Sequence, residues 1–156
     1  MEYWMRLARL EADLAEQAGE VPVGAFLLAA DEETVLGSGN NRVVRDADPT
    51  AHAEIVALRA AGRMLGNYRL TGSTLICTLE PCSMCAGAIL HARVAHLIYA
   101  AGDPKAGACG SVLTVLNHPR LNHTVTVTKG VLAEACSQQL SNFFRSRRGS
   151  RALRPN

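Results

Sequence analysis

The apolar residues near the N-terminus recur at intervals of three and four positions, with charged residues between them. They are Tyr3, Leu7, Leu10, Leu14 and Ala18. This spacing places them on one face of an α-helix. We therefore expect an amphipathic helix over residues 2–18 that ends near a glycine at position 19, because glycine commonly follows a helix C-terminus.

Five later segments are either continuously apolar or alternate between apolar and polar residues, which predicts β-strands. They are residues 21–30, 34–39, 73–79, 94–101 and 123–128. The acidic turn at 31–33 joins the first two strands as a hairpin. One short helical crossover separates the third strand from the fourth, so these two strands should be parallel. The fifth is expected at an edge of the sheet.

Four more helices are predicted from periodicity and capping signals, at residues 49–66, 81–92, 112–116 and 132–148. Asp48 would cap the first of them, with Pro49 just inside. However, residues two apart in a regular helix point about 200° away from each other. His52 and Glu54 can therefore face one site only if the regular helix begins close to His52. Together the elements predict an α/β fold, a three-layer α/β/α sandwich with a mixed five-stranded sheet flanked by helices.

Composition supports one globular domain over residues 1–156. Apolar residues make up 48% of the chain and charged residues 19%, and no apolar run approaches the roughly 20 residues of a membrane span. The charged N-terminal segment does not resemble a secretory signal, so we expect a cytoplasmic protein without a membrane segment. The formal net charge is +2, but residues 141–156 contain five arginines and no acidic residue. This basic C-terminal tail (145–156) indicates either a polyanionic partner or a solvated chain end.

The candidate chemistry lies in His52-Ala53-Glu54 and in Pro81-Cys82-Ser83-Met84-Cys85. One imidazole and two thiols form a three-ligand zinc set whose fourth position stays open, as in catalytic zinc sites. Pro81 would open a helix that holds both cysteines in its first turn, where the helix dipole favours thiolates. Glu54 could then move protons to and from a zinc-bound water. Two alternatives are a core histidine with two buried thiols, and a structural zinc completed by His91 or His96.

The remaining cysteines, Cys77, Cys109 and Cys136, lie among apolar or small residues and are expected to be plain thiols. An odd cysteine number with one C-x-x-C pair favours metal or redox chemistry over a disulfide framework. The loop at 101–110 lacks the ending of a nucleotide-binding P-loop. Glu80, directly before Pro81, is a candidate positioning residue beside the site, and Ala53 and Pro81 flank the ligands.

The pairing of H-x-E with P-C-x-x-C is the signature of zinc-dependent base deaminases. Similarity extends well beyond it, and the chain resembles the bacterial tRNA-specific adenosine deaminases, a cytidine deaminase-like family. The segments that carry this resemblance are residues 2–5, 20–25, 40–42, 48–55, 67–70, 78–82, 84–88, 103–105, 122–123 and 143–145.

The resemblance implies a homodimer with one Zn²⁺ per subunit that converts adenosine to inosine at the wobble position of a tRNA anticodon stem-loop. By the same resemblance, Asn41 would hydrogen-bond the extruded base, and Asp103 and Lys105 would contact the RNA strand beside it. Arg147 and Arg148 would meet phosphates.

Two other functions stay open. One is a deaminase of free bases or nucleotides (guanine, cytosine or dCMP) on the same fold, which would have little use for the arginine cluster. The other is a non-catalytic zinc module that binds RNA, which would have no need of Glu54. The low aromatic content of 4% disfavours a general single-strand binder, since such proteins stack successive bases on aromatic side chains.

Overall fold

The computed structural model of the protein describes residues 1–152, with side chains described through residue 150. Its elements follow in the order α1 (Glu2–Gln17), β1 (Gly24–Leu28), β2 (Val35–Asn40), α2 (Ala53–Leu65), β3 (Thr74–Leu79), α3 (Ser83–His91), β4 (His96–Ala101), β5 (Thr126–Lys129) and α4 (Ala133–Ala152). The last four residues, including Arg154 of the basic tail, lie outside the described part. None of the described helices is long and apolar enough to cross a membrane.

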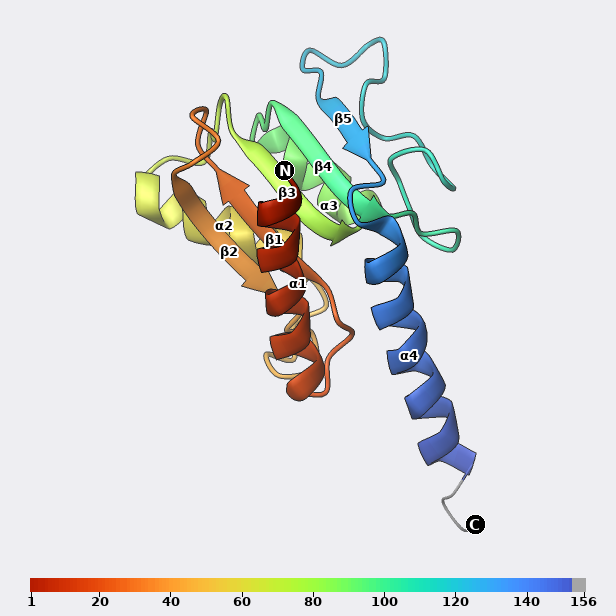
Figure 1. The fold of residues 1–156 in the computed structure, drawn as a ribbon. Coiled ribbons are helices and arrows are strands. Elements are labelled where there is room, and N and C mark those ends of the chain that lie inside the picture. Colours follow the sequence, from red (N-terminus) through yellow and green to blue (C-terminus); the bar gives the residue numbers. More distant parts are fainter. Residues whose placement is uncertain (153–156) are drawn as a thin grey trace.

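The five strands form one mixed sheet in the order β2-β1-β3-β4-β5. β1 runs antiparallel to both β2 and β3, while β3, β4 and β5 are parallel to one another. This confirms the predicted hairpin, the parallel crossover through α3 and the mixed five-stranded sheet. Helices cover both faces of the sheet (Figure 1), so the architecture is the predicted three-layer sandwich.

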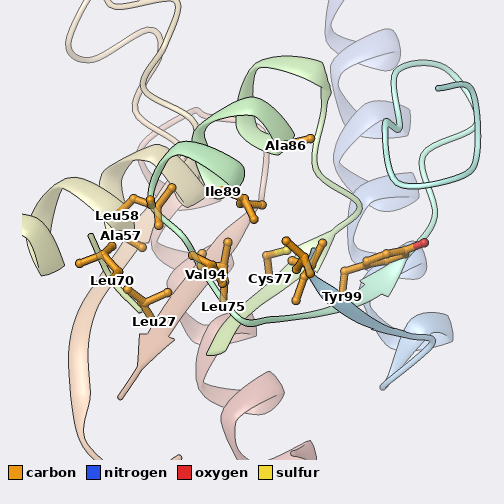
Figure 2. Close-up of a cluster of buried hydrophobic side chains, with 14 of the residues drawn as sticks. Leu27, Ala57, Leu58, Leu70, Leu75, Cys77, Ala86, Ile89, Val94 and Tyr99 are labelled. Carbon is orange, nitrogen blue, oxygen red and sulfur yellow. The ribbon is translucent and has the colours of Figure 1, made fainter. Parts of the chain in front are cut away.

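Neighbouring residues of the central strands point to opposite faces and supply two cores. The pairs are Leu27 with Leu28, Leu75 with Ile76, and Leu97 with Ile98. The first member of each pair packs under α2 and α3, in the cluster drawn in Figure 2, and the second packs under α1 and α4. Because both faces are covered, these strands are apolar at nearly every position, which made them recognisable in the sequence.

The approach of α2 to the sheet depends on a glycine in β2. A Cβ added at Gly39 would lie 2.6 Å from the carbonyl oxygen of Ala53 and 2.8 Å from the Cβ of Val56. These separations are far below normal contact distances, so only glycine permits this packing. Gly39 thereby sets the position of the first turn of α2, which carries the motif residues.

The expectation that the regular helix begins close to His52 is confirmed, because α2 begins at Ala53 with His52 as its N-cap. The predicted Asp48 cap with Pro49 inside the helix was wrong, because the Asp48 carboxylate accepts the N–H and the hydroxyl of Thr50 in a turn before the helix. Residues 112–116 form a loop and not a helix. The backbone N–H groups of Val112 and Leu113 donate to the carbonyl of Gly107, a contact with another part of the same loop that replaces helical hydrogen bonds.

Candidate active site

Three side chains from two helix N-termini meet at the end of β3. His52 is the N-cap of α2, and its extended backbone (φ −70°, ψ 154°) lies outside the regular helix as the geometry required. Cys82 is the N-cap of α3, and Cys85 lies in its first turn. One ligand atom from each of these three residues lies within 4.8 Å of the other two. The structure thus brings together the three predicted metal ligands.

The separations within this cluster fit a tetrahedral ion. The Nδ1 atom of His52 lies 3.5 Å from the Sγ of Cys82 and 3.6 Å from the Sγ of Cys85. Zinc–sulfur bonds of about 2.3 Å and a zinc–nitrogen bond of about 2.0 Å, at tetrahedral angles, require nitrogen–sulfur separations of about 3.5 Å. The donor set and its spacing therefore fit zinc without rearrangement.

The two thiols of the cluster have pKa values shifted in opposite directions. A hydrogen bond with the Cys85 thiol lowers the pKa of Cys82 to about 3. The same bond, together with burial, raises the pKa of Cys85. Hydrogen bonding to Cys82 also raises the pKa of His52. A thiolate stabilised at the N-terminus of a helix is the form in which cysteine binds a metal.

Glu54 is almost fully enclosed beside these ligands. Its side chain lies in the first turn of α2, and the residue is 3% exposed. Burial raises the pKa of the Glu54 carboxyl group to about 7. A carboxyl group with a pKa near neutrality can both accept and release a proton under working conditions. The burial and the raised pKa of Glu54 are therefore compatible with its predicted role as a general acid and base.

Glu80 ties the loop after β4 to the metal-ligand segment. Its buried carboxylate accepts the backbone N–H groups of Asp103 (2.9 Å), Cys109 (2.9 Å) and Ser111 (3.1 Å), and also the Ser111 hydroxyl. Burial alone would raise the pKa of Glu80, but these hydrogen bonds outweigh it and hold the pKa below its ordinary value. A Cβ added at Gly107 would lie 2.4 Å from this carboxylate, so the loop passes too close to Glu80 for any residue but glycine at position 107.

The same loop also contacts the ligand segment through its backbone. The N–H of Ala108 donates to the carbonyl of the buried Pro81 (2.9 Å), and Gly107 forms a β-bridge with Cys82. The loop residues therefore lie against the metal-ligand segment at a position that Glu80 helps to fix.

Asn41 lies directly after β2, near the start of α2. The N–H of Arg42, its neighbour, donates to the carbonyl of Ala51, next to His52 (2.9 Å). Asn41 is 8% exposed, and among the described residues its side-chain oxygen finds no hydrogen-bond partner. An unpaired buried acceptor is costly and rare, so a bound ligand is one explanation for it.

A groove of about 1120 Å³ separates the loop after β4 from α4. Its walls carry Asp103 and Lys105 on the loop side and Arg145, Arg147 and Arg148 on the helix side. None of the three clustered ligands is among its described lining residues, so the groove lies beside the metal cluster and not over it. Its basic lining suits a polyanion.

Two of the predicted RNA-contacting residues also have partners within the protein. The Asp103 carboxylate accepts the N–H groups of Lys105 (2.9 Å) and Ala106 (3.2 Å), which shapes the loop. Arg147 donates a hydrogen bond to the carbonyl of Gly19, and its guanidinium lies 5.0 Å from the ring centroid of Phe143. Arg147 thereby attaches α4 to the segment after α1, whereas Lys105 and Arg148 are exposed.

Other candidate ligands lie outside the cluster. His96 pairs with the Thr128 hydroxyl (2.9 Å), and His91 is exposed at the end of α3. Burial raises the pKa values of Cys77 and Cys136. Within the described residues, neither a fourth protein ligand nor a second metal cluster is found. The open fourth position therefore agrees with a catalytic and not a structural site.

Comparison with known proteins identifies the family. The model of the cytidine and deoxycytidylate deaminase zinc-binding region matches residues 1–101. A tRNA-specific adenosine deaminase from Haemophilus influenzae is 51% identical over 152 residues, which are 97% of this chain and 87% of that protein. The chain belongs to the tRNA-specific adenosine deaminase family.

Solved structures agree with this assignment. A structure from a study of A-to-I editing by tRNA:A34 deaminases is 40% identical, with a TM-score of 0.84 over 89% of this chain and 99% of that one. A guanine deaminase from Nitrosomonas europaea has a TM-score of 0.80 and 26% identity, over 91% of this chain and 83% of that one. The tRNA deaminase thus resembles this chain more in both sequence and structure, although the fold also supports deamination of a free base.

Proposed function

We propose that this protein is a zinc-dependent hydrolase that deaminates adenosine to inosine at the wobble position of a tRNA anticodon. The observation that carries the chemistry is the enclosed Glu54 carboxyl group beside a three-ligand cluster with tetrahedral spacing. Zinc held by His52, Cys82 and Cys85 would supply an activated water molecule. The relatives named tRNA-specific adenosine deaminase support the choice of substrate.

The protein's own contribution to the reaction is proton transfer by Glu54. This carboxylate takes a proton from the water that attacks the ring carbon bearing the amine, and gives it to the neighbouring ring nitrogen. A second transfer through the same group protonates the amine, so that the carbon–nitrogen bond breaks and ammonia leaves. Water and adenosine are consumed, and inosine and ammonia are formed.

Asn41 and the basic groove recognise different parts of the RNA, the base and the phosphates. The buried oxygen of Asn41 accepts an N–H of the extruded base, which completes its hydrogen bonding. Lys105 and Arg148, on opposite walls of the groove, bind phosphates of the flanking strand. We further propose a homodimer with one zinc ion per subunit that works in the cytoplasm, as the family resemblance implies.

The test is inosine formation on an anticodon stem-loop that carries a wobble adenosine, with free adenosine, cytidine and guanine assayed in parallel. Inosine on the RNA alone is the expected result. Ammonia release from guanine or cytidine without reaction on RNA would identify a free-base or nucleoside deaminase instead. A zinc-loaded protein that leaves every substrate unchanged would favour the non-catalytic module.

A further inference from the structure

Glu20 is a buried carboxylate that the proposed reaction does not use. It lies between α1 and β1 and is 1% exposed. Its two oxygens accept the backbone N–H groups of Val44 (3.2 Å) and Arg45 (2.7 Å). These residues belong to the loop that connects β2 to α2, about two dozen positions further along the chain. The carboxylate therefore holds this loop from the inside of the protein.

Arg45 extends the contact from Glu20 to Asn41. Its Nε lies 3.8 Å from the Glu20 carboxylate, and its side chain is only 30% exposed. One terminal nitrogen donates to the backbone carbonyl of Asn41 (2.8 Å) and to the side-chain oxygen of Asn40 (2.5 Å). The guanidinium thus bridges the buried carboxylate and the main chain at Asn41.

Asn41 is consequently held at both ends of its own backbone. Its N–H donates to the carbonyl of Val23 (3.1 Å), and its carbonyl accepts from Arg45. The side-chain oxygen of Asn41 is the buried acceptor that has no partner among the described residues. The main chain that carries this side chain is therefore fixed before a ligand arrives, and such preorganisation reduces the cost of binding.

We infer that Glu20 and Arg45 form a clamp that positions Asn41 toward the substrate base. Both are positioning residues, since they act on the base only through Asn41. This inference rests on the proposed base contact of Asn41. A displacement of about 1 Å at a contacting group can lower the reaction rate about 100-fold. Replacing Arg45 or Glu20 should therefore lower kcat/KM by about 10- to 100-fold, while the zinc content stays unchanged.

The experiment compares steady-state deamination of the wobble-adenosine stem-loop by Arg45→Met, Arg45→Lys and Glu20→Ala, each loaded with zinc. Arg45→Met is the main variant because its side chain is partly exposed, whereas Glu20→Ala could unfold the protein. Lysine keeps the charge but has all its donors on one nitrogen, whereas the guanidinium faces Glu20 and the Asn41 carbonyl with different nitrogens, so lysine should recover only part of the loss. The matched control is Asp31→Ala. Asp31 accepts two backbone N–H groups (2.9 Å each) in the turn at the opposite end of β2, and its variant should be as active as wild type.

A mutant cycle with Asn41→Ala separates positioning from a general structural effect. If Arg45 acts through Asn41, adding Arg45→Met to Asn41→Ala should cause less than a twofold further loss. Equal losses in both backgrounds, or wild-type kinetics for Arg45→Met, would overturn the inference. If the wild type converts guanine and not RNA, the proposed substrate fails but the same cycle on guanine still tests the clamp.

Discussion

Replacing Glu80 by alanine should loosen the loop that covers the metal-ligand segment. The carboxylate is 2% exposed and accepts three backbone N–H groups and one hydroxyl from that loop. A hydrogen bond to a charged group contributes about 1.5–3 kcal/mol when its partner is left buried. Because Ser111 is exposed and Asp103 half-buried, water can replace part of the lost bonding. We expect the free energy of unfolding to fall by about 2–4 kcal/mol.

Urea denaturation of the zinc-loaded protein, followed by far-UV circular dichroism, measures this loss directly. Glu80→Gln keeps the side-chain volume and one acceptor oxygen, so its loss of stability should be smaller than that of Glu80→Ala. Some loss should remain, because the NH₂ group of glutamine faces backbone donors. Asp31→Ala, which removes a similar carboxylate from an exposed turn, should change the midpoint least. Equal midpoints for Glu80→Ala and wild type would refute the reasoning.

The pH dependence of stability offers a second test of Glu80. Hydrogen bonds hold the pKa of this carboxyl group below its ordinary value in the folded protein. Its contribution to the free energy of unfolding is therefore fully present above the unfolded-state pKa of about 4.3. This contribution is lost as the pH falls through the pKa of the folded state. Glu80→Gln has no carboxylate to titrate at this position. The difference in the free energy of unfolding between wild type and Glu80→Gln should therefore shrink on acidification. A difference that is constant from pH 7 to pH 3 would contradict this.

Three further outcomes follow from the geometry. Glu54→Gln should keep its zinc, measured by plasma mass spectrometry, and its melting temperature, but lose about 10²- to 10⁴-fold in kcat; loss of zinc together with activity would make the carboxylate structural. Gly39→Ala should lower the free energy of unfolding by about 1–3 kcal/mol, since the added Cβ overlaps α2. Gly62→Ala, inside α2 with only an ordinary contact at 3.5 Å, should raise it by about 0.5–1 kcal/mol in the same urea titration. Lys105→Met and Arg148→Met should each weaken binding of the RNA stem-loop and reduce its salt slope by about one, and an unchanged slope would remove them from the phosphate contacts.

The strands and the metal ligands were predictable because their signals are local. β1, β3 and β4 are buried on both faces, so their sequences are almost continuously apolar. The three ligands stand at helix starts, where fixed spacing brings side chains together. The loop at 112–116 has a similar apolar composition, but its hydrogen bonds go to Gly107 and not along a helix. Its conformation follows from tertiary contacts that periodicity does not record.

The loop partners of Glu20 and Glu80 escaped sequence reasoning for a related reason. Glu20 was part of a family-like segment, but its partners Val44 and Arg45 lie far along the chain. Glu80 was a predicted positioning residue because it precedes Pro81, yet the loop it holds could not be named. Gly107 carried no signal beyond a Gly- and Ala-rich context, although no larger residue fits above Glu80. Such contacts join segments whose spacing in sequence has no fixed relation to their distance in space.

Two glutamates beside the metal ligands are similarly shielded from solvent but have opposite pKa shifts. Glu54 and Glu80 are 3% and 2% exposed. Burial alone disfavours the charged form of both. Around Glu80, four hydrogen bonds from one loop outweigh that effect, so the group remains a carboxylate and serves as a fixed attachment point. Around Glu54, burial dominates and raises the pKa to about 7, so this group can exchange protons near neutral pH. Burial around Glu54 and hydrogen-bond donors around Glu80 thus give these two shielded carboxyl groups opposite pKa shifts.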